Sequence, residues 1–269
     1  MFSQFKSPSS YNIGLFLMLI VVDVPFVVAE QATRHEPKPF LDIAPWGRLL
    51  SLDSKLILQV DRAPVDGTVS IPRLNNPVKA VYFDNMPNRQ LELKPGVREW
   101  NIHWPEIRPA KAGDAIVIQL EGKPFLPKQP RMIRPNANGQ IQLAAHNAVT
   151  HGEALRYEPQ PHKNTLGYWT RDKDWAEWHF TINCGNAYTV EVRYGCGTGH
   201  GGSVVRLECA QQNLQWQVAE TGGFQTWREF RPGKLQLNTP GKYTMVLRAV
   251  HLQHKAVMDV QQIVLTPEK

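Results

Sequence analysis

Apolar and polar residues alternate with a period of two in short segments along most of this chain, and this alternation constrains the fold more than any other feature. It is typical of a β-strand with one buried face, because successive side chains point to opposite faces of a sheet. No stretch sustains the i, i+3, i+4 apolar spacing of an amphipathic helix. The clearest predicted strands are Lys55–Val60, Ala115–Leu120, Val190–Tyr194, Val205–Cys209 and Tyr243–Val250.

Turn signals separate these segments and indicate the fold class. Clusters of proline, glycine and asparagine lie between the predicted strands at Val65–Gly67, Asn75–Pro77, Lys94–Gly96 and Thr239–Gly241. Such clusters favour tight turns. Short strands joined in this way are typical of antiparallel sandwiches. We therefore expect an all-β protein with two antiparallel β-sandwich domains in tandem.

A change of composition divides the chain. Phe125–Gly139 (FLPKQPRMIRPNANG) contains three prolines, scattered charges and a terminal Asn-Gly pair, without periodicity. Such a segment favours an extended linker. A chain of 269 residues has room for two domains of ordinary size. We expect an N-terminal extension over 30–44, a first sandwich over 45–124, a linker over 125–140 and a second sandwich over 141–269.

The N-terminus has the features of an export signal. Lys6 supplies a positive charge, Ile13–Val22 is an apolar core, and Val27–Ala29 offers small residues at a cleavage site. This pattern predicts a signal peptide over 1–29 and a secreted or periplasmic protein with no membrane partner after cleavage. An uncleaved membrane anchor is the alternative, but Asp23 interrupts the apolar run and leaves it short for a full span.

Cysteine content and charge limit the classes of partner. The chain has three cysteines, Cys184, Cys196 and Cys209, so at least one thiol per monomer is free unless chains cross-link. Cys196 and Cys209 end two consecutive predicted strands and could pair in an oxidising compartment, whereas buried free thiols are the simpler expectation. The net charge of +6 is scattered along the chain. Because no nucleic-acid-binding motif accompanies it, we expect no nucleic-acid partner.

Aromatic residues crowd into two segments of the second predicted sandwich. Leu166–Trp178 (LGYWTRDKDWAEW) and Thr221–Trp227 (TGGFQTW) place flat apolar rings beside short polar side chains. A sugar can stack its C–H face on such a ring while its hydroxyls pair with donors and acceptors. Most of these aromatics are expected in the core, Trp178 and Trp227 among them. The candidates for carbohydrate binding are Tyr168, Trp169, Asp174, Trp175, Phe224 and Gln225.

The acidic residues predict no catalytic site. Asp172, Asp174 and Glu177 fall close together near the start of one predicted strand, whereas a glycosidase needs two carboxyl groups held a fixed distance apart across a cleft. Glu158 and Asp259 lie early and late in the second sandwich, in strands that are often neighbours. Their oxygens could bind calcium, the one candidate cofactor. The alternative is an exposed Glu158 and an Asp259 that caps a turn.

The segment Ile141–Pro267 resembles the galactose-binding-like modules of carbohydrate-binding families 6, 35 and 36. The resemblance rests on the order of LAAHNAV, LGYWTRDKDWAEWHF, TGGFQTW, TMVLRAV and VMDVQQIVL. It implies a jelly-roll sandwich that binds glycans through loop aromatics and often holds a structural calcium ion. Asp259 matches the aspartate near the family's final strand. The chain departs from the family at Ala144–His146, where a Glu-Ala-Glu triplet usually serves calcium, and at Phe224, where tryptophan is common.

The segment Pro45–Lys123 resembles the C-terminal β-sandwich of family 29 α-L-fucosidases. The matching stretches are PWGR, KLILQVDRAPVDGTVSIPRLNNPVKAVYF and WNIHWPEIRPAKAGDAIVIQLEGKP. In that family this sandwich follows the catalytic barrel and is itself non-catalytic. Such a barrel needs roughly 250 residues, and only about 15 separate the predicted signal peptide from Pro45. The resemblance therefore implies the rear half of a fucosidase-type protein, without the barrel or its catalytic carboxylates.

These features predict an exported, non-catalytic carbohydrate-binding protein that holds a glycan on loops of the second sandwich. The resemblance favours a fucose- or galactose-containing glycan as the partner. One alternative is an accessory portion or fragment of an α-L-fucosidase that works with a separately encoded catalytic barrel. Another is a structural or adhesion module without a ligand.

Overall fold

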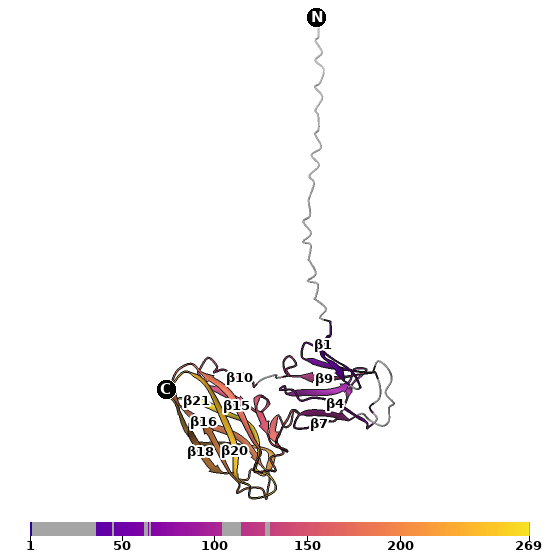
Figure 1. Ribbon diagram of the computed structural model, residues 1–269. Coiled ribbons are helices and arrows are strands. Elements are labelled where there is room, and N and C mark those ends of the chain that lie inside the picture. The colour runs from indigo at the N-terminus through magenta and orange to yellow at the C-terminus, as the bar shows by residue number, and fades with distance from the viewer. Residues whose placement is uncertain are drawn as a thin grey trace. The chain divides into compact units, whose positions relative to one another are not determined.

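The computed structural model describes Met1 and residues 36–44, 46–61, 64, 66–103, 114–126 and 130–268. The predicted signal peptide lies outside the described residues, apart from Met1. In the described part of the chain the regular elements are strands and one 3₁₀ turn. None of its helices is long and apolar enough to cross a membrane. The prediction of an all-β fold is therefore confirmed (Figure 1).

The first sandwich consists of two sheets. The larger sheet runs in the order β1 (Lys38–Ala44), β2 (Gly47–Leu52), β3 (Lys55–Val60), β9 (Asp114–Leu120), β5 (Val78–Phe83) and β6 (Met86–Gln90). The smaller sheet runs in the order β4 (Thr68–Pro72), β8 (Glu99–His103) and β7 (Leu93–Pro95). The described pairings in both sheets are antiparallel. β1 lies in the predicted N-terminal extension, where it adds an edge strand to β2.

The core of the first sandwich forms because its strands turn their apolar faces inward. β3 alternates half-buried and buried residues, with Leu56, Leu58 and Val60 inside. From the smaller sheet, the fully buried indole of Trp100 joins them. Fully burying the side chain of a leucine or valine, such as Leu56 or Val60, contributes about 1.5–3 kcal/mol. The alternation that is visible in the sequence is thus the source of this core.

The second sandwich also consists of two sheets. One runs in the order β10 (Met132–Ile133), β15 (Trp175–Ile182), β20 (Gly241–His251), β17 (Val204–Cys209) and β18 (Gln212–Gln217), with β12 (Val149–His151) also paired to β15. The other runs in the order β13 (Arg156–Glu158), β14 (Thr165–Gly167), β21 (Asp259–Pro267), β16 (Asn186–Cys196) and β19 (Gly223–Leu237), with β11 (Ile141–Ala144) beside β21. The long strands β15 and β20 run side by side in the first of these sheets, and β16 and β21 do so in the second (Figure 1).

Part of the predicted linker belongs to a sheet. β10 pairs with His179 and Phe180 of β15 in parallel register, whereas the other described pairings of the second sandwich are antiparallel. Before it, the side-chain oxygen of Asn76 accepts the N–H of Phe125 at 2.7 Å. The prolines of this segment break the periodicity by which a strand would be recognised, so the sequence favoured a linker throughout.

The core of the second sandwich forms on the same principle. β15 alternates strictly, so that Trp178 and Phe180 are fully buried. The indole N–H of Trp178 donates to the carbonyl of Ala144 at 2.9 Å, which confirms its predicted place in the core. Trp227 is only half-buried, and its prediction as a core residue was wrong. It lies on β19, the last strand of its sheet, which pairs with only one neighbour in that sheet.

The cysteines are all free thiols. Cys196 and Cys209 are buried and Cys184 is exposed, so the expectation of buried unpaired cysteines is correct for two of them. Burial raises the pKa of the Cys196 thiol to about 11 and that of Cys209 to about 12. Both side chains are therefore protonated and unreactive near neutral pH.

Candidate functional site

Two carboxyl groups meet where a short hairpin lies against the last strand. Glu158 ends β13 and Asp259 begins β21, and β14 lies between these two strands. The predicted closeness of the two residues is confirmed. Glu158 is 2% exposed and Asp259 is 5% exposed, so the alternative of an exposed Glu158 is wrong. Two buried acidic side chains with little solvent are costly to ionise together.

Gly167, the last residue of β14, allows these carboxyl groups to approach each other. A Cβ at this position would overlap Oε2 of Glu158 and would lie 3.1 Å from Oδ1 of Asp259. A hydrogen atom is the largest substituent that fits between them. The geometry of the acidic pair therefore depends on a glycine at the end of β14.

The carboxyl groups line a cavity of about 290 Å³, near the lower end of the range for small-molecule sites. Its polar lining comes from Glu158, Asp259, Lys163, Gln225 and Thr170. Its aromatic lining comes from Tyr168, Trp169 and Phe224. Four of the predicted carbohydrate-binding residues thus meet in one place, whereas Asp174 and Trp175 are not part of this lining.

Charge within the cavity is nearly balanced. Lys163 Nζ lies 2.5 Å from Oε1 of Glu158, and Nε2 of Gln225 donates to Oδ2 of Asp259 at 3.0 Å. Burial, and then the charge of Glu158, raises the pKa of Asp259 to about 8. At neutral pH Asp259 therefore carries a proton and can donate as well as accept a hydrogen bond.

Two aromatic rings in the cavity lining have accessible area. Tyr168 is 47% exposed, and its φ of 56° is a left-handed conformation that costs a non-glycine residue roughly 1–2 kcal/mol. The guanidinium of Arg156 lies over its ring, with Cζ 3.4 Å from the ring centre. Phe224 is half-buried, and a Cβ at Gly197 would lie 2.7 Å from its ring. The ring of Phe224 thus packs against Gly197, and the ring of Tyr168 packs against the guanidinium of Arg156.

The predicted stacking role of Trp169 is not supported. Its indole lines the cavity but is 1% exposed, and its N–H donates to the carbonyl of Asp174 at 3.0 Å. Its own carbonyl accepts the N–H of Val257 at 2.9 Å. A ring this buried offers no open face to a sugar, so Trp169 is part of the packing behind the cavity.

Asp174 is also a structural residue, which corrects the prediction that it fixes sugar hydroxyls. It is 1% exposed, and its carboxylate accepts the backbone N–H groups of Glu153, Ala154 and Leu155 at 3.0, 2.8 and 2.8 Å. These bonds hold the loop between β12 and β13. With both oxygens engaged in this way, the side chain is committed to the loop.

Trp175 lies outside the cavity lining, which corrects its inclusion in the predicted site. It begins β15 and shares a face of that strand with Glu177 and His179, opposite to Trp178. Its ring stacks on His151 with centres 3.7 Å apart. The indole is therefore already paired on one side, on the outward face of the sheet.

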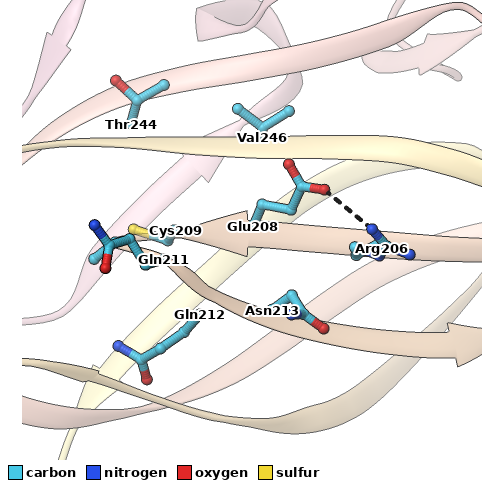
Figure 2. Close-up of a pocket in the computed structure, with 9 residues that line it drawn as sticks. Arg206, Glu208, Cys209, Gln211, Gln212, Asn213, Thr244 and Val246 are labelled. Carbon is cyan, nitrogen blue, oxygen red and sulfur yellow. Dashed lines mark ion pairs between the residues drawn. The ribbon is translucent and has the colours of Figure 1, made fainter.

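A second hollow, of about 320 Å³, lies over β17, β18 and β20 (Figure 2). Its lining includes the polar side chains of Arg206, Glu208, Asn213 and Thr244 beside apolar ones such as Val246. Nη1 of Arg206 lies 3.7 Å from Oε1 of Glu208, and Arg248 pairs with the same carboxylate. Among the described residues, those that line this hollow include no aromatic side chain. It therefore lacks the stacking surface that the first cavity has.

The residues at the acidic pair do not fit calcium. Calcium takes six to eight oxygen ligands, whereas Glu158 and Asp259 supply two carboxyl groups, and the ammonium of Lys163 already neutralises one of them. In the part of the chain that the structure describes, no group of three or more His, Cys, Asp or Glu side chains could hold a metal ion. Lys163 provides the positive charge at this position, and no motif in the sequence identifies it.

The fold is thus a tandem of β-sandwiches, and the second has a small pocket lined by aromatic and polar side chains. No protein-family model and no curated protein matches the chain. Solved structures with partial similarity include an α-L-fucosidase from Vibrio sp. strain EJY3, at 16% identity over 83% of this chain, with a TM-score of 0.35. The chain spans only 40% of the length of that fucosidase.

Carbohydrate-binding modules are also among the similar structures. The C-terminal family 6 module of a marine laminarinase from Zobellia galactanivorans is 17% identical over 47% of this chain and 98% of the module, with a TM-score of 0.39. A family 35 module from Clostridium thermocellum is 16% identical over 48% of this chain and 98% of the module, with a TM-score of 0.40.

Proposed function

We propose that this protein is a non-catalytic carbohydrate-binding protein whose cavity beside Asp259 holds a sugar ring. The observation that carries the proposal is the meeting of accessible aromatic rings, Tyr168 and Phe224, with hydrogen-bonding groups of both kinds in one cavity. An aromatic face takes the C–H face of a sugar. The polar groups around it then orient the hydroxyls.

The polar groups are suited to hydroxyls because they include both donors and acceptors. Lys163 and Gln225 donate, Glu158 accepts, and protonated Asp259 does both. A sugar hydroxyl is itself a donor and an acceptor, so a mixed set satisfies it better than carboxylates alone. The side chains already hold one another in place, which lowers the entropy lost on binding.

Export and a preference among glycans accompany this binding role. We propose a secreted or periplasmic protein, with fucose- and galactose-containing glycans as the first ligands to test. An accessory role beside a separately encoded α-L-fucosidase barrel is the alternative within the same class. Binding at one small site is expected to be weak, because little area is buried against the cost of association.

Phe224→Ala is expected to weaken glycan binding about tenfold, because a loss of about 1.4 kcal/mol corresponds to part of the roughly 1.5–3 kcal/mol that full burial of a phenyl ring contributes. A glycan array probed with the chain from residue 30 onward identifies the ligand. Quenching of tryptophan fluorescence then gives the dissociation constant, and Trp169 in the cavity lining is the expected reporter.

Trp175→Ala is the matched control, because Trp175 is a half-buried aromatic outside the cavity lining. It should leave the dissociation constant unchanged. Loss of binding in Trp175→Ala but not in Phe224→Ala would place the site elsewhere. Absence of any glycan hit would favour the structural or adhesion module. Release of nitrophenol from an aryl α-L-fucoside by the pure protein would overturn the non-catalytic assignment.

Protein stability is expected to fall as the pH rises toward 8, because of Asp259. Its pKa is raised from 3.8 to about 8 in the folded protein, by burial first and by Glu158 second. Between these values the folded state binds a proton that the unfolded state has lost, so the contribution is fully present below about pH 4 and is lost as the pH rises through about 8. Thermal unfolding at several pH values should show this decline in wild type and a flatter one in Asp259→Asn. Parallel profiles for the two proteins would contradict the assignment.

A further inference from the structure

One face of the hairpin formed by β13 and β14 lines the cavity, and its other face is directed away from the cavity. Glu158 at the end of β13 and Lys163 in the connecting turn both line the cavity. Tyr157 precedes Glu158 and points to the opposite face, because side chains alternate along a strand. It is fully buried, and its hydroxyl donates to Oδ1 of Asn164 at 2.8 Å. The far side of the hairpin therefore holds the turn that carries Lys163.

The turn itself is hydrogen-bonded to the first sandwich. The carbonyl of Pro159, the residue after Glu158, accepts the N–H of Val78 in β5 at 2.9 Å. The next side chain, Gln160, donates through Nε2 to the carbonyl of Leu93 in β7 at 3.0 Å. Two strands of the first sandwich thus bind the residues that immediately follow a cavity carboxylate.

Gln160 also organises the rest of the turn. Its carbonyl accepts the N–H groups of Lys163 and Asn164, each at 2.9 Å. The side chain of Gln160 is bound to the first sandwich and its carbonyl to the backbone of Lys163. The position of the cavity ammonium is therefore connected to the first sandwich through one residue.

Arg73, in the turn after β4, adds a further contact from the first sandwich. Nη1 donates to Oγ1 of Thr150 at 2.8 Å and Nη2 to the carbonyl of Ala148 at 3.1 Å. Its Cζ lies 5.8 Å from the centre of the Tyr157 ring. Burial lowers the pKa of Arg73 to about 10, so the guanidinium remains charged near neutral pH and keeps its donors in place.

We propose that the first sandwich is a positioning element of the carbohydrate site, and that Gln160 and Arg73 are its positioning residues. This inference rests on the proposed function. A turn between two strands of three residues each would sample many conformations by itself. Contacts from the first sandwich restrict this turn before a ligand arrives, so less conformational entropy is lost on binding. The tandem is thus one binding unit, in which the first sandwich holds Glu158 and Lys163 without touching the sugar.

Gln160→Ala and Arg73→Lys in the full chain test this inference. Amide hydrogen exchange without ligand should become faster at Lys163 and Asn164 in both variants. Glycan affinity should fall about threefold to tenfold, the range that one net hydrogen bond supports. The pH midpoint of Asp259 titration should also decrease, because a displaced Glu158 no longer repels the ionised form. A residue that only stabilised the fold would not change that midpoint.

Gln119→Ala is the matched control. Its Nε2 donates to Oγ of Ser54 at 2.8 Å, within the first sandwich and away from the hairpin. Exchange in the turn and glycan affinity should both match wild type. Gln160→Ala keeps the test valid if Arg73→Lys unfolds. Gln160 is only half-buried, so its replacement by alanine is the milder change.

The outcomes separate this inference from the proposed function. Unchanged exchange at Lys163 and Asn164 in both variants would overturn the inference, as would faster exchange with unchanged affinity. If wild type binds no glycan, the proposed function fails on its own, and the exchange rates still show whether the first sandwich holds the turn.

Discussion

Asp174→Ala is expected to destabilise the protein by about 3–5 kcal/mol, since each hydrogen bond to a charged group contributes about 1.5–3 kcal/mol. Its carboxylate accepts three backbone N–H groups, from Glu153 to Leu155. Alanine would leave these donors without their acceptor, and the N–H of the buried Leu155 would have no partner. The loop packs so closely on the carboxylate that a Cβ at Gly152 would overlap Oδ1. A rearranged loop cannot easily replace the lost acceptor.

Urea denaturation of three variants measures this effect. Asp174→Asn should lose less stability than Asp174→Ala, because the amide retains one oxygen acceptor and the same shape. Asp172→Ala removes an exposed carboxylate two residues away and should change stability by less than about 0.5 kcal/mol. Equal destabilisation in Asp174→Ala and Asp172→Ala would show that the carboxylate does not hold the loop.

Gly167→Ala is expected to eliminate measurable glycan binding and to lower stability by about 1–3 kcal/mol, the usual cost of overpacking. The added methyl would overlap Oε2 of Glu158 and press on Oδ1 of Asp259. The two carboxyl groups must then separate, and the polar lining of the cavity is lost. The pKa of Asp259 should decrease at the same time, because the charge of Glu158 moves away from it.

Glycan titration and the pH dependence of stability, both on Gly167→Ala, test this prediction. Gly122→Ala is the control for a glycine change without a collision. Nothing lies within 4 Å of a Cβ at Gly122, and its φ of 73° makes alanine mildly unfavourable. That variant should lose some stability and keep full affinity. Retention of binding by Gly167→Ala would show that the acidic pair is not part of the site.

The strands could be predicted because their pattern is local. Alternation along β3 and β15 assigns each side chain to a face, and the burial of Trp178 follows directly. The same rule places Trp175 outside, because it lies an odd number of residues from Trp178. The closeness of Glu158 and Asp259 was expected from neighbouring early and late strands, but β14 lies between β13 and β21. The two carboxyl groups meet because Gly167 of β14 has no side chain between them.

Burial between strands could not be predicted in this way. Trp169 and Asp174 lie between β14 and β15, where no alternation assigns a face. Their partners are a backbone segment about twenty residues earlier, Glu153–Leu155, and each other. Lys163 was missed for a related reason: a turn with two prolines indicates a bend, but it does not show which side chain the bend directs into a cavity.

The pairing of β10 with β15 has a consequence for solubility. β15 pairs with β20 along one edge, and on its other edge β12 covers Trp175–Glu177 while β10 covers His179 and Phe180. An uncovered edge of such an apolar strand would be a template for association with other chains. The segment that joins the two sandwiches thus also covers part of a strand edge that would otherwise be open to association with other chains.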